Sequence, residues 1–256
     1  TIDDLAYLLD FSLLNRIGNR VSTLAYLDKA ELQSRIQQLR DPGLQQEYRI
    51  NQLIVCTFSL DFERFELLLN EAVKEWGIGR TIDEIILPFI ERLGLFSYKG
   101  RSAIEYHFIV TAIRKKLMLG IERTYSYHAQ SESVVLFLPQ GEHFDLLLLY
   151  VHYHLQKAGF KTLYFGTDIP SKNIQAMMTK TRPHLAVTYI SGSKAQTVKK
   201  IADYLPERDA TTTLIAAPGT FLSTVNLPAF SNARFVDYKN VVAEAIMQFE
   251  LTEAVV

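Results

Sequence analysis

Five short apolar runs alternate with helix-length segments over about the last 120 residues of the chain, and this alternation constrains the fold most. The runs cover residues 134–139, 162–166, 184–190, 213–217 and 233–238. Continuous apolar runs of this length are typical of strands that are covered on both faces. Strict alternation of strand and helix predicts βαβ units and a doubly wound parallel sheet, which is a Rossmann-like domain over residues 129–256.

The preceding segment, residues 41–128, has helical periodicity almost throughout. Asp41-Pro42-Gly43 is the first strong break, and we expect Asp61 to cap one of the helices that follow. Thr81 to Glu84 has the spacing of a capping box, and a long helix opens at Ser102. Four helices with short joints predict a helical bundle, so the fold class is α followed by α/β. Residues 1–40 are patchily helical and form a linker.

Composition excludes several functional classes. With 256 residues and a net charge of -1, the chain has no electrostatic footprint for wrapping nucleic acid. The single cysteine, Cys56, favours a reducing compartment, so we expect a cytoplasmic protein. No apolar stretch reaches roughly 18 residues, which predicts no contact with a membrane. The chain opens in mid-pattern with acidic residues, so we expect it to be a piece of something longer.

The loop after the first apolar run contains Gly141, Glu142 and His143. Ligands of doubly wound sheets bind outside the carboxyl ends of the strands, where this loop lies. His143 is therefore either a metal ligand, with Glu142 or Asp145 fixing its tautomer, or a solvated loop residue. The sequence alone leaves both readings open.

The other histidines give weaker signals. His152 and His154 are two residues apart on one helix, so they face different sides and we interpret them as surface or interface residues. His107 has apolar neighbours, which is typical of a satisfied core histidine. There is no phosphate-binding glycine loop, and no nucleophile, base and orienting group can be assembled, so we expect no enzyme.

Three segments together resemble the cobalamin-binding region of MerR-family transcriptional regulators. Residues 87–108 resemble the bundle segment that faces the cofactor, and residues 138–170 resemble the segment from the ligand loop to a Gly-x-x-x-Pro turn, matched here by Gly166 and Pro170. Residues 11–36 look like the stretch that follows the winged-helix DNA-binding head, which would be absent from this chain. The resemblance implies cobalamin between bundle and sheet, with His143 as the lower cobalt ligand.

The ligand loop departs from the pattern of that family. There, the histidine lies two residues after an acid and three before a glycine. Here Glu142 and His143 are adjacent, Phe144 occupies the spaced position, and Leu146 or Leu147 replaces the glycine. The cofactor's nucleotide tail passes that glycine, and a leucine there fills the space that the tail needs.

The remaining family positions are partly kept. On the bundle side, Phe96 stands where the family has tryptophan, and His107 is matched. On the sheet side, Ser191 and Ser193 match the family's serine turn, and Gly219 matches one of the two adjacent glycines that the family has there. These residues would contact the cofactor and its tail.

Three functional hypotheses follow from the resemblance. The chain is the effector-sensing and oligomerisation region of a MerR-like regulator, a homo-oligomer that binds cobalamin and reaches DNA only through the absent head. Alternatively, the same region has lost the cofactor site and acts as an apo oligomerisation or protein-interaction module. A corrinoid carrier subunit of a methyltransferase is the third hypothesis, and the altered loop argues against it.

Overall fold

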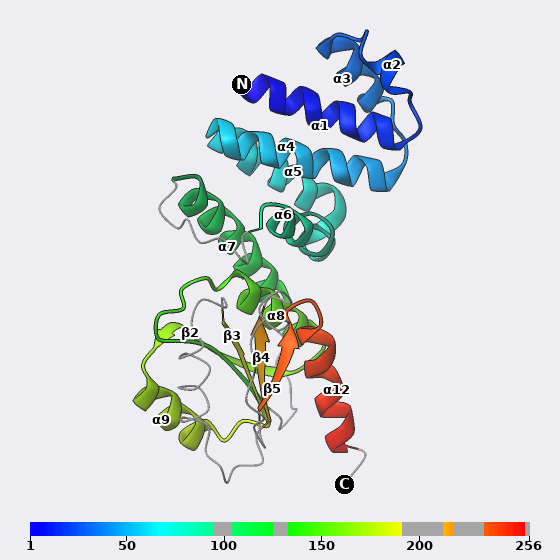
Figure 1. The fold of residues 1–256 in the computed structure, drawn as a ribbon. Helices are drawn as coiled ribbons and strands as arrows, with labels where there is room; N and C mark the ends of the chain where they lie inside the picture. The colour runs from blue at the N-terminus through cyan, green and yellow to red at the C-terminus, as the bar shows by residue number, and fades with distance from the viewer. Residues whose placement is uncertain (95–103, 125–132, 191–211, 218–232, 254–256) are drawn as a thin grey trace. The chain divides into compact units, whose positions relative to one another are not determined.

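The computed structural model describes residues 1–94, 104–124, 133–190, 212–217 and 233–253 (Figure 1). The chain divides into two compact units, Thr1–Lys116 and Leu117–Val256. The first is helical and the second is an α/β unit. This is the predicted order of a helical region followed by a parallel sheet.

Three helices open the helical unit: α1 (Ile2–Arg16), α2 (Val21–Leu24) and α3 (Lys29–Gln37). Both α1 and α3 begin with a capping box in which side chain and backbone satisfy each other's polar groups, and Asp28 and Glu31 form the one on α3. The apolar sides of the three helices meet in a core cluster made by Leu14, Leu24, Leu32 and Ile36. Residues 1–40 are therefore a packed part of the helical unit.

The predicted break at Asp41-Pro42-Gly43 is the start of a helix, α4 (Pro42–Ser59). The Asp41 side chain accepts a 3.0 Å hydrogen bond from the Leu44 N–H, and Pro42 occupies the first helical position, where its missing N–H costs nothing. The next helix, α5 (Phe62–Thr81), is capped by Asp61 as expected.

The predicted capping box at Thr81 is wrong. Gly77 has a non-helical φ of +78° inside α5, and the Thr81 hydroxyl donates to the Gly77 carbonyl instead of capping a new helix. A π-helix, η1 (Ile82–Ile86), follows directly and leads into α6 (Leu87–Arg92). The break therefore comes from Gly77, because glycine adopts a positive φ without steric cost.

The last bundle helix, α7 (Ile104–Thr124), packs on α5. The Phe108 ring stacks on Phe62 at 4.0 Å, and Lys115 donates to Glu66 at 2.9 Å. Since α4 contacts α5, α6 and η1 as well, the bundle prediction is confirmed. No helix among the described residues is long and apolar enough to cross a membrane.

The α/β unit contains a five-stranded sheet in which every pairing is parallel. Its order is β2-β1-β3-β4-β5. The strands agree with the five apolar runs and are β1 (Ser133–Pro139), β2 (Lys161–Ile169), β3 (Leu185–Tyr189), β4 (Thr212–Ala217) and β5 (Ala233–Asp237). All seven residues of β1 are buried, which explains why its sequence shows no polar alternation.

Helices cover both faces of this sheet (Figure 1). On one face α9 (Ser171–Thr181) packs its methionines against Val135 and Phe137 of β1. The opposite face of the sheet is covered by α8 (Leu146–Lys157) and α12 (Val241–Glu253), which contact each other. The helix expected at residues 195–205 lies outside the described residues. The doubly wound prediction is confirmed.

Candidate functional site

The loop between β1 and α8 forms the candidate site because of where the sheet order places it. In the order β2-β1-β3, the chain leaves β1 toward one edge of the sheet and leaves β3 toward the other. Ligands of doubly wound sheets bind at such a switch point, outside the carboxyl ends of the strands. The loop begins with a tight turn, in which the Glu142 N–H donates to the Pro139 carbonyl at 2.9 Å and Gly141 has a φ of +91°.

Two hydrogen bonds tie this loop to the end of β2. The Gly141 N–H donates to Asp168 Oδ1 at 2.7 Å, and the Asp168 N–H donates to the Glu142 carbonyl at 3.2 Å. Asp168 adopts a φ of +60°, a left-handed conformation that aspartate tolerates better than most residues. The neighbouring strand end therefore fixes the shape of the loop.

His143 is exposed at the tip of this braced loop, whereas Glu142, Phe144 and Asp145 around it are buried. Its imidazole is therefore accessible to a ligand from solvent, which fits both readings of the sequence. The Phe144 side chain, at the position of the family's histidine, is only 4% exposed and belongs to the core.

A polar and aromatic cluster that the sequence analysis did not identify lies between α8 and β2. The Tyr164 hydroxyl donates to Asp145 Oδ2 at 2.9 Å, and the Tyr164 ring stacks on His152 with 5.7 Å between ring centroids. Burial lowers the pKa of His152 to about 4, so this imidazole is neutral at physiological pH. His152 is half-buried, so it is neither a fully exposed surface residue nor part of the core. In the sequence, only the three- and four-residue spacing of Asp145, Leu149 and His152 hinted at a shared face.

The first turn of α8 is filled by leucines. Leu146, Leu147, Leu148 and Leu149 are each at most 1% exposed, so every direction around this turn is occupied. The position at which the resemblance expects a glycine therefore offers no free space.

The other predicted site residues lie apart from this loop or outside the described part of the chain. His107 on α7 is exposed, so its interpretation as a core histidine is wrong. Gly166 has a φ of +88° and pairs with Phe137 where the β1–β2 register shifts, so it belongs to a bulge within β2, which continues to Ile169. The predicted contacts that lie outside the described residues are Phe96, Ser191, Ser193 and Gly219.

The described residues contain no group of three or more histidine, cysteine, aspartate or glutamate side chains that could hold a metal ion. A single imidazole at position 143 is thus the one metal-binding feature that the sequence analysis proposed and these residues retain. Such a group suits a metal that arrives already bound in a larger ligand, because one side chain alone gives a free ion too few ligands.

No protein-family model matches the chain, and no curated protein matches it significantly. Among solved structures, the Methanosarcina barkeri monomethylamine corrinoid protein is similar, with a TM-score of 0.59 at 13% identity over 79% of this chain and 99% of that chain. This likeness establishes the fold: a helical region followed by a cobalamin-binding-type parallel sheet.

Two further structures resemble the chain less closely. The methanol:cobalamin methyltransferase complex MtaBC from Methanosarcina barkeri has a TM-score of 0.40 at 15% identity, over 89% of this chain and 92% of that chain. A cobalamin-binding protein from Desulfitobacterium hafniense DCB-2 has a TM-score of 0.38 at 12% identity, over 78% and 98%.

Proposed function

We propose that this chain is the oligomerisation and protein-interaction region of a MerR-like transcriptional regulator, and that it acts without cobalamin. The fold supports the first part, because it has the helical region and sheet that the resemblance requires. The sequence of residues 11–36, which resembles the stretch after a winged-helix head, supports the link to DNA binding. The leucine-filled first turn of α8 carries the second part.

The fit of a corrinoid to these residues is incomplete. An exposed imidazole at His143 suits a lower cobalt ligand. A nucleotide tail, in contrast, would have to displace Leu146 or Leu147, which are at most 1% exposed. Close-packed interiors resist such insertion, so among the described residues the first turn of α8 leaves no room for the tail.

A spectrum and an oligomeric-state measurement test this proposal. The purified protein is incubated with adenosylcobalamin in the dark, desalted and analysed by light scattering after size exclusion. We expect no retained corrinoid absorption and the same oligomeric state with and without the compound. His143→Ala should assemble and, in the full regulator, bind DNA like the unmodified protein. Retained corrinoid, or assembly that depends on it, would overturn the proposal.

Cobalamin sensing is the second candidate, and the position of His143 favours it. The loop places this imidazole, exposed and braced by Asp168, at the carboxyl edge of the sheet. In that case Phe96 and His107 would contact the cofactor from the bundle, and Ser191, Ser193 and Gly219 would contact its tail. A corrinoid would shift assembly only by binding one state better than the other. Retention that is lost in His143→Ala is the result that distinguishes this candidate.

A corrinoid carrier of a methyltransferase has the same fold, so the likeness to the monomethylamine corrinoid protein is equally consistent with it. Such a carrier must hold cobalt through repeated reactions, which requires a tightly bound cofactor. The same spectrum separates this function from the apo module, and copurification with a methyl-transferring partner separates it from a regulator.

A further inference from the structure

A buried carboxylate lies where the first three helices meet the rest of the helical unit. Asp10 on α1 is 3% exposed, and the packing of α1 on α4 is the main contact between these three helices and the bundle. Within the described part of the chain, Asp10 Oδ1 is buried and has no hydrogen-bond partner. Burying an ionised carboxylate without a partner is costly. The interior beside α1 therefore tolerates the protonated form of Asp10 far better than the ionised form.

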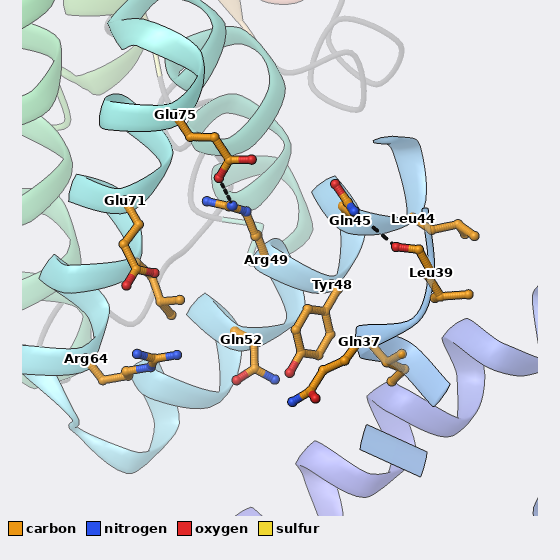
Figure 2. A pocket seen from close by; sticks show the side chains of 12 residues that line it. Gln37, Leu39, Leu44, Gln45, Tyr48, Arg49, Gln52, Arg64, Glu71 and Glu75 are labelled. Carbon is orange, nitrogen blue, oxygen red and sulfur yellow. Dashed lines mark hydrogen bonds and ion pairs between the residues drawn. The ribbon is translucent and has the colours of Figure 1, made fainter. Parts of the chain in front are cut away.

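Tyr48 shows that Asp10 lies on the side of α1 that faces α4. Burial raises the pKa of the Tyr48 phenol, and the nearby Asp10 carboxylate raises it further, whereas Arg64 lowers it. Tyr48 packs on the core of the first three helices and also lines a surface groove, on whose α5 wall Arg64 lies (Figure 2). A phenol with a raised pKa is neutral at physiological pH, so Tyr48 offers Asp10 no positive charge.

Among the described residues, no charge on the helices packed against α1 compensates Asp10. Burial raises the pKa of its carboxyl group to about 6, and no cation offsets that rise. Lys29 of α3 is paired with Asp3, and Arg49 of α4 is paired with Glu75. Helix α2 has no charged side chain. The remaining charged residues of α3 and α4 are Glu31, Arg35 and Glu47. The protonation of Asp10 therefore depends on how well its carboxyl group is shielded from water.

The first three helices form a packed segment that is distinct from the rest of the helical unit. They share a core cluster of their own, formed by Leu14, Leu24, Leu32 and Ile36. The Arg16–Glu47 ion pair between α1 and α4 involves partly exposed side chains, so it adds little to the contact. Local opening of this contact exposes less apolar surface than global unfolding and requires less free energy. It also hydrates Asp10, so ionisation of this carboxyl group favours it.

We propose that Asp10 is a proton-controlled latch: its protonated carboxyl group keeps α1, α2 and α3 docked on α4, and loss of the proton promotes their release. The pKa of Asp10 is about 6 when the helices are docked and returns to about 3.9 when water reaches the carboxyl group. The docked state is therefore favoured most below about pH 4, and opening increases as the pH rises toward 6 and above. This device goes beyond the proposed function and does not depend on it, because it lies wholly within the helical unit.

Hydrogen exchange at pH 5 and pH 7, corrected for the intrinsic exchange rate at each pH, measures this opening. The two pKa values of Asp10 make the opening constant about tenfold larger at pH 7 than at pH 5. An isolated helix of 15 residues is marginal in water, so the amides of α1 should exchange through the open state. We expect the protection factors of α1 and α3 to fall about tenfold, and those of α5 to fall much less. An equal fall in α5 would indicate global destabilisation and overturn the proposal.

Asp10→Asn keeps the shape of the side chain and removes the titrating group, so the protection of α1 should be the same at both pH values. Asp3→Asn is the matched control, because Asp3 is exposed on the same helix, and it should keep the tenfold change. In the unmodified protein, a carbon-13 NMR titration of the Asp10 carboxyl carbon should have its midpoint near pH 6. A midpoint below about pH 5, or a pH-dependent protection of α1 that survives Asp10→Asn, would overturn the proposal.

Discussion

The Gly141 N–H and the Asp168 carboxylate are 2.7 Å apart across the gap between the β1–α8 loop and the end of β2. Asp168 returns a second hydrogen bond from its own N–H to the Glu142 carbonyl. The loop that carries His143 is therefore held in place by the end of the neighbouring strand β2.

Asp168→Ala should loosen that loop. It removes the acceptor for the Gly141 N–H and leaves alanine at a φ of +60°, so we expect a loss of about 1 to 3 kcal/mol in unfolding free energy. Hydrogen exchange of the amides at 141–143 should accelerate more than exchange within β1. Asp168→Asn keeps an oxygen acceptor, and asparagine also tolerates the left-handed conformation. Its unfolding free energy and its hydrogen exchange should therefore stay close to those of the unmodified protein. Equal exchange in both variants would show that the loop is rigid without this contact.

His152 should make the α/β unit less stable in acid. Its pKa is about 4 in the folded state and about 6.5 when unfolded, so the unfolded state binds the proton first as the pH falls. The stability that depends on neutral His152 is therefore present above pH 6.5 and is lost toward pH 4. Between pH 7 and 5 we expect a loss of about 1 to 2 kcal/mol in unfolding free energy, measured by urea denaturation.

His152→Phe keeps an aromatic ring beside Tyr164 and removes the titrating group, so it should flatten this pH dependence. His184→Gln, at an exposed position before β3, is the matched control and should leave the slope unchanged. A slope that survives His152→Phe would assign the acid sensitivity to another group.

The sheet could be predicted from the sequence because buried parallel strands leave an unmistakable signal. VVLFLP has no polar alternation, since both faces of β1 are covered. The capping of α5 by Asp61 could also be predicted from the sequence, because an N-cap depends on local geometry alone.

Positions decided by tertiary contacts could not be predicted. Thr81 has the right spacing for a capping box, but the positive φ of Gly77 gives its hydroxyl a different acceptor. His107 has apolar neighbours in sequence and is nevertheless exposed, because only one face of α7 packs. Asp145 and Tyr164, which form a hydrogen bond, are 19 positions apart in the sequence, and the periodicity of neither segment predicts that contact.

Asp10 should have the opposite pH effect in the helical unit. It is 3% exposed on α1, and burial raises its pKa to about 6, so the folded state holds the proton more tightly than the unfolded state does. The stability contributed by protonated Asp10 is present below about pH 4 and is lost as the pH rises through 6. Asp10→Asn removes the buried charge. It should raise the unfolding free energy by about 1 to 2 kcal/mol at pH 8, by roughly half as much at pH 5 and by much less at pH 4.

Asp3→Asn is the control on the same helix, because Asp3 is exposed and its charge remains solvated. It should leave stability unchanged within a few tenths of a kcal/mol. If Asp10→Asn destabilises the protein equally at all three pH values, the carboxylate has a structural partner that the amide cannot replace.

Leu147→Gly should reopen the space that the resemblance assigns to a nucleotide tail. Leu147 is 1% exposed, so its removal leaves a cavity in the first turn of α8 and costs about 3 to 5 kcal/mol of unfolding free energy. If close packing is what excludes cobalamin, the variant should retain corrinoid absorption after desalting whereas the unmodified protein does not. Cobalamin should also restore part of the lost melting temperature, because a ligand stabilises the state that it binds.

Leu147→Ala is the milder variant if the glycine variant fails to fold, and Leu146→Gly tests the adjacent candidate position. Adding His143→Ala to Leu147→Gly tests whether the exposed His143 imidazole ligates cobalt. If it does, the double variant should no longer retain corrinoid absorption. Adding Phe144→His places an imidazole at the family's spacing, but Phe144 is 4% exposed, so that ring would need the loop to turn outward. A folded Leu147→Gly protein that stays colourless would place the barrier in the ligand loop rather than in the packing of α8.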